Sequence, residues 1–262
     1  MTNPPLNKAI RLDCASVSEI GMRSSNQDHL GLAEQDDMRC FTVADGAGGH
    51  QGGEIASRVV VDALLAKFGA ESAFGARALR CYVEHAAHQL VLARQGKPEL
   101  ADMSTTVAAL LLDQANARAV WAHLGDTRIY LFRGTRLHAV TRDHSLTQQL
   151  IDAGYARTDQ LRSHPQRNIL IAAVGSEGES APSVTELPVE LADGDAFLMC
   201  TDGLWEWVHE DDMEQTLATA QDSQAWLSAM CGIADHAARL SGKTRDNYSA
   251  YAIRVRQPEQ ST

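Results

Sequence analysis

The sequence lacks a long hydrophobic run, and it contains few cysteines. Nowhere in its 262 residues do about 18 apolar residues follow one another, as a membrane-spanning helix requires. The N-terminal stretch MTNPPLNKAIRLD has no apolar signal core. The five cysteines are widely spaced and form no CxxC pair, which is typical of reduced thiols in a reducing compartment. These absences predict a cytoplasmic protein with no membrane segment.

Basic residues are also scarce relative to acidic ones. The formal net charge is −11, and a chain this acidic repels nucleic acid and anionic lipid, so we expect neither as a partner. Hydrophobic residues make up 44% of the chain, enough for a substantial core. No linker rich in Pro, Ser or Gly interrupts the middle. We therefore expect a single domain over residues 10–256, between a loose tail at 1–9 and a short tail at 257–262.

Apolar periodicity predicts an α+β fold. Expected strands, with both alternating and continuous apolar runs, cover residues 12–18, 30–33, 40–44, 105–112, 119–124, 128–133, 137–140, 184–187, 196–200 and 248–255. Expected helices cover residues 54–68, 76–93, 145–153, 211–220 and 223–240. Because strands come in runs and helices largely in pairs, we expect antiparallel sheets covered by antiparallel helix pairs. The polar, irregular segment 155–167 is typical of a surface flap.

Five aspartates lie at the edges of expected strands: Asp28, Asp45, Asp126, Asp202 and Asp246. A single Asp-Gly pair there is usually only a turn. Several neighbouring carboxylates, however, repel one another and require neutralisation. Mg²⁺ or Mn²⁺ suits such oxygen ligands, and two such ions can activate a bridging water for attack on phosphorus. The bare stretch GAGGHQGGE after Asp45 would let a backbone carbonyl reach a metal.

Three other chemistries fit less well. The stretch GAGGHQGGE lacks the Gly-Lys-Ser/Thr of a P-loop and does not match GxGxxG cleanly. The ten histidines include no HExxH or Cys-plus-His zinc spacing. No cysteine begins a CxxxxxR phosphate loop, which disfavours a cysteine nucleophile.

A series of motifs resembles the protein phosphatase 2C family, the metal-dependent Ser/Thr protein phosphatases, in its compact bacterial form. The motifs are, in order, VSEIGMRSSNQD, FTVADGAGGHQGGEIAS, STTVAALLL, WAHLGDTRIYLFRG, HPQRNILIAAVGS, DAFLMCTDGLWEWV and RDNYSAYAIRV. They span Leu12 to Val255 in the family's order. The resemblance implies a four-layer α/β/β/α sandwich, in which two antiparallel sheets are flanked by antiparallel helix pairs.

The same resemblance implies a ligand set for two Mn²⁺ or Mg²⁺ ions. Asp45 would bridge both ions, and the Gly46 carbonyl would bind the second. Asp202 and Asp246 would complete the first. Asp28 would hold metal-bound waters. These assignments follow from the motif matches and not from spacing.

Three more residues match family positions at the same site. Asp126 in GDTR corresponds to an aspartate that helps bind a third, weaker ion. Arg23 corresponds to the arginine that grips the substrate phosphate, a task suited to a bidentate guanidinium. His50 corresponds to the histidine of DGMGGH. It would either donate a proton to the leaving oxygen or orient a metal-bound water.

The chain departs from the family pattern at four positions near these motifs. Ala47 replaces a common Met or His, Gln27 a common Glu, Ser249 a Thr and Thr127 a Ser. None of these departures removes a core aspartate, so the resemblance implies an active enzyme.

The segment 145–167 falls where the family has its variable flap, although it would also read as a plain surface loop. Its basic residues Arg157, Arg162, His164 and Arg167 would attract an acidic phosphopeptide.

The resulting expectation is a phosphatase that hydrolyses phosphoserine and phosphothreonine without a covalent intermediate. Its partners would be phosphoproteins and a bacterial Ser/Thr kinase that it opposes, and it would act as a monomer. Two alternatives stay open: a weakly catalytic regulator that binds phosphoproteins, and a phosphomonoesterase acting on small molecules.

Overall fold

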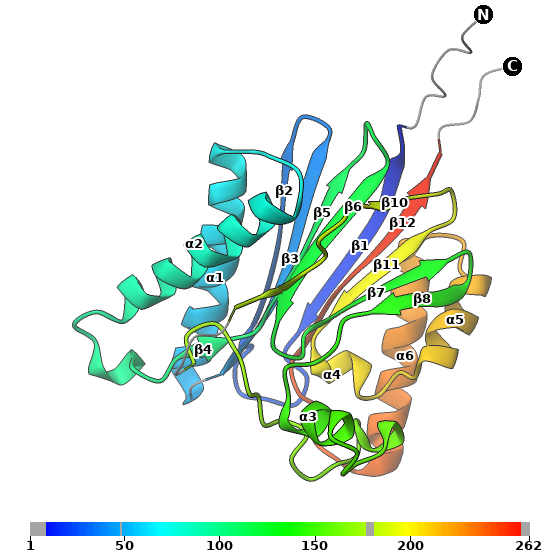
Figure 1. The fold of residues 1–262 in the computed structure, drawn as a ribbon. Helices are drawn as coiled ribbons and strands as arrows, with labels where there is room; N and C mark the ends of the chain where they lie inside the picture. The colour runs from blue at the N-terminus through cyan, green and yellow to red at the C-terminus, as the bar shows by residue number, and fades with distance from the viewer. Residues whose placement is uncertain (1–8, 48, 177–180, 258–262) are drawn as a thin grey trace, which may run out of the picture.

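The computed structural model describes residues 9–47, 49–176 and 181–257, apart from the side chains of residues 49–51. Two antiparallel sheets lie face to face, and helices cover their outer faces (Figure 1). The first sheet has the order β1 (Arg11–Glu19), β12 (Tyr248–Arg256), β11 (Ala196–Cys200), β7 (Arg128–Arg133) and β8 (Arg136–Val140). The second has the order β10 (Val189–Glu190), β6 (Arg118–Leu124), β5 (Val107–Asp113), β3 (Met38–Ala47) and β2 (Asp28–Gln35), with β4 (Ser104–Thr105) on β3 and β9 (Ser183–Val184) on β6.

The helices cover the two sheets as separate groups (Figure 1). Helices α1 (Gly49–Ala70) and α2 (Ala76–Arg94) pack on the second sheet, and α5 (Glu210–Thr219) and α6 (Ser223–Ser241) lie over the first. The remaining helical pieces are short: η1 (Pro98–Leu100), α3 (Leu146–Asp152), η2 (Thr158–Gln160) and α4 (Asp202–Trp205). Helix α6 begins at the N-cap Asp222, whose carboxylate accepts from the Ala225 amide, and it ends at Gly242 in the left-handed conformation.

The strands are apolar on both faces because each sheet lies between two layers. In β5, Val107, Ala109 and Leu111 point toward α1 and α2, whereas Ala108, Leu110 and Leu112 point toward the other sheet. This is the two-residue period of a strand with two buried faces. Between the sheets, Phe41 meets Tyr251 edge to face at 5.2 Å. The α+β class and the sandwich are thereby confirmed.

One expectation about the glycine-rich stretch was wrong. We expected a bare loop and a helix from residue 54, but α1 already begins at Gly49. The glycines serve close packing here. A Cβ on Gly46 would lie 2.0 Å from the Gly53 carbonyl oxygen, and one on Gly53 would lie 2.7 Å from the Gly46 oxygen. The start of α1 therefore rests directly on the end of β3, which only glycine permits.

Two further expectations were wrong in detail. The strand expected at 184–187 is replaced by two short strands, β9 and β10, since the following Pro188 has no amide hydrogen to continue the ladder. The short helix α4 was not anticipated.

The tails expected at 1–9 and 257–262 lie outside the described residues, except Ala9 and Gln257. Among the described helices, none has the length and apolarity needed to cross a bilayer.

Candidate functional site

A cavity of about 200 Å³ opens at one end of the sandwich, and we call it the site cavity. Its walls come from distant segments, namely the turn before β2, the end of β3, the β6–β7 turn, the start of α4 and the turn before β12. Its lining includes Arg23, Asp45, Gly46, Asp126, Asp202 and Asp246. The fold thus brings together six of the eight residues singled out from the sequence.

Asp28 lies beside this cavity, within the protein. It stands directly opposite Asp45 in the β2–β3 ladder, so the two side chains emerge on the same face. The Thr201 hydroxyl donates to Asp28 Oδ2 at 2.9 Å, while Oδ1 is buried without a hydrogen-bond partner in the described part of the chain. Burial, partly offset by this hydroxyl, raises the pKa of Asp28 to about 7.

Asp45 and Asp202 are crowded by other carboxylates. Burial first, and then the charges of Asp28 and Asp202, raise the pKa of Asp45 well above its usual value. Burial and the charge of Asp126 do the same for Asp202. These mutual influences show that the aspartates share one electrostatic neighbourhood, whose negative charge is costly without a cation.

Two buried threonines, Thr106 and Thr127, connect the main chain at Asp45 with the main chain at Asp126. The Asp45 amide donates to Thr106 Oγ1 at 2.8 Å, and the Thr106 amide donates to the Asp45 carbonyl at 2.8 Å. The hydroxyls of Thr106 and Thr127 lie 2.6 Å apart, and Thr127 follows Asp126 directly. Thr106 therefore fixes Asp45 relative to Asp126. The sequence did not single out Thr106, because the only signal for this residue was its place in the STTV motif.

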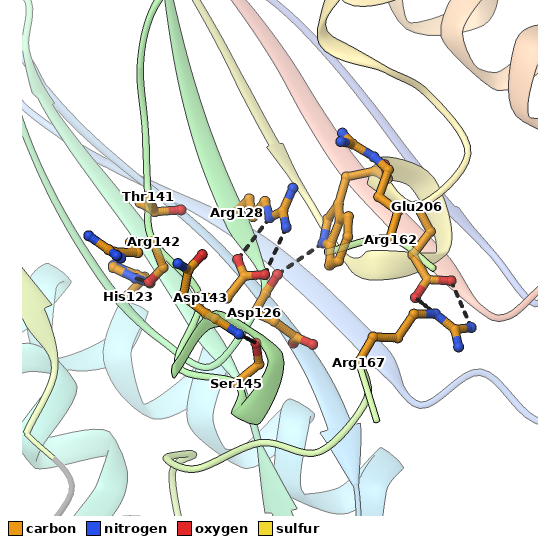
Figure 2. A network of polar contacts seen from close by, with 12 residues as sticks. His123, Asp126, Arg128, Thr141, Arg142, Asp143, Ser145, Arg162, Arg167 and Glu206 are labelled. Carbon is orange, nitrogen blue, oxygen red and sulfur yellow. Dashed lines mark hydrogen bonds and ion pairs between the residues drawn. The ribbon is translucent and has the colours of Figure 1, made fainter. Parts of the chain in front are cut away.

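A second missed network anchors Asp126 (Figure 2). The Trp205 indole N–H donates to the Asp126 carbonyl oxygen at 2.9 Å. The Arg128 guanidinium stacks 3.5 Å from the Trp205 ring centroid and forms a bidentate pair with Asp143 at 2.8 and 2.7 Å. Since Trp205 ends the short helix that Asp202 begins, this network sets the position of Asp126 relative to Asp202. Burial, with the charge of Asp143, raises the pKa of Asp126 to about 7.

Arg23 sits at the mouth of the site. Its guanidinium contacts Asp246 Oδ2 at 2.5 Å, and its side chain is 55% exposed. The preceding loop is held by the Met22 amide, which donates to the Arg245 carbonyl at 3.0 Å. An exposed guanidinium beside the aspartates is placed to meet an incoming anion.

The flap arginines are less available than we expected (Figure 2). Arg157 pairs with Asp159, and Arg162 pairs with Glu210 at 2.9 Å. Arg167 pairs with Glu206 at 2.5 Å, as Figure 2 shows. The Arg162 Nε also donates to the Trp205 carbonyl at 2.9 Å. These contacts fasten the flap to α4 and to the start of α5. The Arg162 and Arg167 pairs hold the flap, and attraction of an acidic phosphopeptide by the basic flap residues stays a prediction.

The donor set fits a hard divalent cation. It consists of carboxylate oxygens and, at Gly46, a backbone without a side chain in the way. The unpartnered buried Oδ1 of Asp28 points to a missing polar partner. Within the described ranges, no three His, Cys, Asp or Glu side chains converge into a cage of their own. The side chain of His50 lies outside the described part of the structure.

The fold and the site define a four-layer α+β protein with an acidic, oxygen-lined cavity at the end of its sheets. Comparison with known proteins identifies the family. Residues 17–241 match the model of the protein phosphatase 2C family. The serine/threonine phosphatase stp of Listeria welshimeri is 33% identical over 202 residues, which cover 75% of this chain and 79% of that protein.

Solved structures agree. That of the Mycobacterium tuberculosis serine/threonine phosphatase PstP/Ppp has a TM-score of 0.79 at 28% identity, and the match covers 95% of this chain and 100% of that one. A structure of the PstP catalytic domain in complex with two manganese ions has a TM-score of 0.78 at 26% identity, covering 95% and 99%. The chain belongs to the protein phosphatase 2C family and is a phosphoprotein phosphatase.

Proposed function

We propose that this protein hydrolyses phosphoserine and phosphothreonine in proteins with the help of Mn²⁺ or Mg²⁺. The observation that carries the proposal is the gathering of Asp28, Asp45, Asp126, Asp202 and Asp246, from five distant segments, around one site next to Arg23. Burial and neighbouring carboxylates raise the pKa values of Asp45 and Asp202 well above their usual range, and a bound cation would favour the ionised form of both. The named relatives and the manganese-containing neighbour support the same reading.

The proposed roles of the aspartates are those that the motif matches imply. Asp45, Asp202 and Asp246, with the Gly46 carbonyl, would hold two ions, and Asp126 would hold a third. Asp28 is buried behind Asp45, so it would act through metal-bound water. When bound, the ions supply a water molecule of lowered pKa and neutralise negative charge at the site. The threonine and tryptophan contacts described above hold the main chain of Asp45 and Asp126 in place.

Arg23 would hold the substrate phosphate. A guanidinium offers two parallel N–H donors to two phosphate oxygens, and this one is exposed and already close to Asp246. The phosphate would replace that carboxylate as its partner. No cysteine nucleophile is needed, because buried Cys200 has a strongly raised pKa through loss of solvation.

His50 would donate a proton to the leaving seryl or threonyl oxygen, or orient a metal-bound water. We further propose that the protein works in the cytoplasm as a monomer, in one domain over 10–256, against a bacterial Ser/Thr kinase. The bacterial origin of the named relatives supports this setting.

The test is release of phosphate from a phosphothreonine peptide by purified protein, with Mn²⁺ and then with excess EDTA. Asp202→Asn, which keeps the side-chain shape and removes the charge, is the matched variant. We expect release that depends on Mn²⁺, disappears in EDTA and falls at least about 100-fold in Asp202→Asn, a loss of 2.7 kcal/mol or more in transition-state stabilisation. No release by folded wild-type protein with either metal would overturn the proposal.

A further inference from the structure

A second cavity of about 470 Å³, which we call the side cavity, lies between the C-terminal end of α6 and the chain that links β1 to β2. One wall contains Ile20 and Met22, and the opposite wall contains Ala238, Gly242 and Lys243. None of the residues assigned above to metal or phosphate lines it. Its volume is enough for a large apolar side chain together with part of its backbone.

The side cavity lies next to the phosphate end of the active site. Met22 precedes Arg23 in the chain, and Arg245 precedes Asp246. Lys243 lines both the side cavity and a smaller cavity of about 190 Å³, whose other walls include Arg23, Asp202 and Asp246. An extended peptide advances about 3.3–3.6 Å per residue. A substrate residue within three positions of the phosphorylated one therefore spans roughly 10 Å, enough to pass Arg23 and enter this space.

The walls are suited to an apolar side chain. Met22 is 68% exposed and Ile20 is 42% exposed, although exposure of an apolar side chain to water is unfavourable. Arg245 lines the base of the side cavity and is held in place by two contacts. Its guanidinium stacks 3.5 Å from the Tyr248 ring centroid and pairs with Asp235. Arg245 is 3% exposed, and its Nη2 has no hydrogen-bond partner among the described residues.

The charge at the junction favours an acidic segment. Four basic residues line the smaller cavity: Arg23, Arg162, Arg167 and Lys243. The three arginines are paired with Asp246, Glu210 and Glu206. Lys243 makes no ion pair within the described residues, and it is exposed. It is thus the available positive charge between the two cavities, in a chain whose net charge is −11.

We propose that the side cavity is a substrate subsite that reads the sequence around the phosphorylated residue. It takes an apolar side chain within three positions of phosphothreonine or phosphoserine, on one side of it, while Lys243 meets an acidic side chain between them. The occupant is the phosphoprotein substrate in an extended conformation. This inference rests on the proposed function, because it places the phosphorylated residue at Arg23.

Binding tests the subsite without relying on turnover. A fluorescent peptide carries a non-hydrolysable phosphonate analogue of phosphothreonine between alanines, and leucine is placed at each position within three residues on either side. We expect leucine at one or two positions on one side to strengthen binding about tenfold, from partial burial of its side chain. An aspartate between the phosphothreonine analogue and the leucine should strengthen binding by a further factor of about two to three at low salt, and this gain in affinity should vanish at high salt.

Variants locate the effect. Met22→Ser should remove most of the leucine preference, and Lys243→Glu should reverse the aspartate preference. Leu92→Ser and Lys97→Glu are matched controls, because both change exposed residues that line neither cavity. A flat leucine scan, or a preference that survives Met22→Ser or is lost in the controls, would overturn the proposal.

Hydrolysis of p-nitrophenyl phosphate with Mn²⁺, measured on the same preparations, separates the two hypotheses. This substrate has no peptide flanks, so Met22→Ser should leave its rate unchanged. Absent hydrolysis with a retained leucine preference would reject the catalytic proposal and leave the subsite. Normal hydrolysis with a flat leucine scan would reject the subsite alone.

Discussion

Replacing Trp205 by phenylalanine should loosen the metal site through a single hydrogen bond. The indole N–H donates to the Asp126 carbonyl oxygen at 2.9 Å, and both residues are buried. Phenylalanine keeps an aromatic face for Arg128 but leaves that carbonyl unpaired. An unsatisfied buried polar group costs about 1–3 kcal/mol, and the smaller ring adds a cavity term. We therefore expect the free energy of unfolding to fall by about 2–4 kcal/mol.

Trp226 provides a matched control for this variant. Its indole N–H donates to the Met213 carbonyl at 3.1 Å in the core beside α6, and it too is fully buried. Urea unfolding should show a similar loss for Trp205→Phe and Trp226→Phe. Only Trp205→Phe should also weaken Mn²⁺ binding, measured by calorimetry, because only Trp205 ties Asp126 to the helix that carries Asp202. Equal Mn²⁺ affinity in the two variants would refute this positioning role.

Three further predictions concern stability. Gly46→Ala should strongly lower the thermal unfolding midpoint, because its Cβ would lie 2.0 Å from a backbone oxygen; Gly69→Ala, with no atom within 4 Å, should change it little or raise it. Asp28→Asn should stabilise the protein in EDTA increasingly as the pH rises from 4 to 8. The raised folded pKa of about 7 means that wild-type protein loses stability as this group ionises. Buried His123, whose pKa desolvation lowers to about 4, should cost stability as the pH falls from 6.5 to 4. His123→Gln should flatten that part of the urea-unfolding profile, and an unchanged profile would contradict the assignment.

Much of the fold follows from local pattern. A helix with one apolar face and a strand flanked by turn residues can each be recognised from the spacing of apolar residues in the sequence. The boundaries of α2, β7 and β11 therefore agree closely with those expected. The five aspartates were also visible, since each stands at the edge of an apolar run. The motif order then supplied the sandwich, which periodicity alone did not reach: strands such as β5, apolar on both faces, carry no sign of which layer each face meets.

The rest depended on contacts between residues far apart in sequence. The glycine-rich residues 49–53 look like a loop when only conformational freedom is weighed, yet they form the start of a helix that packs closely on β3. The flap arginines look free until the fold brings Glu206 and Glu210 against them. The sequence by itself determined which residues could carry metal and phosphate chemistry, because side-chain type and local period are local properties. Only the tertiary structure decided that Thr106 and Trp205 hold those residues together and that Lys243 has no ion-pair partner among the described residues, because partners across the fold are not encoded in any short stretch.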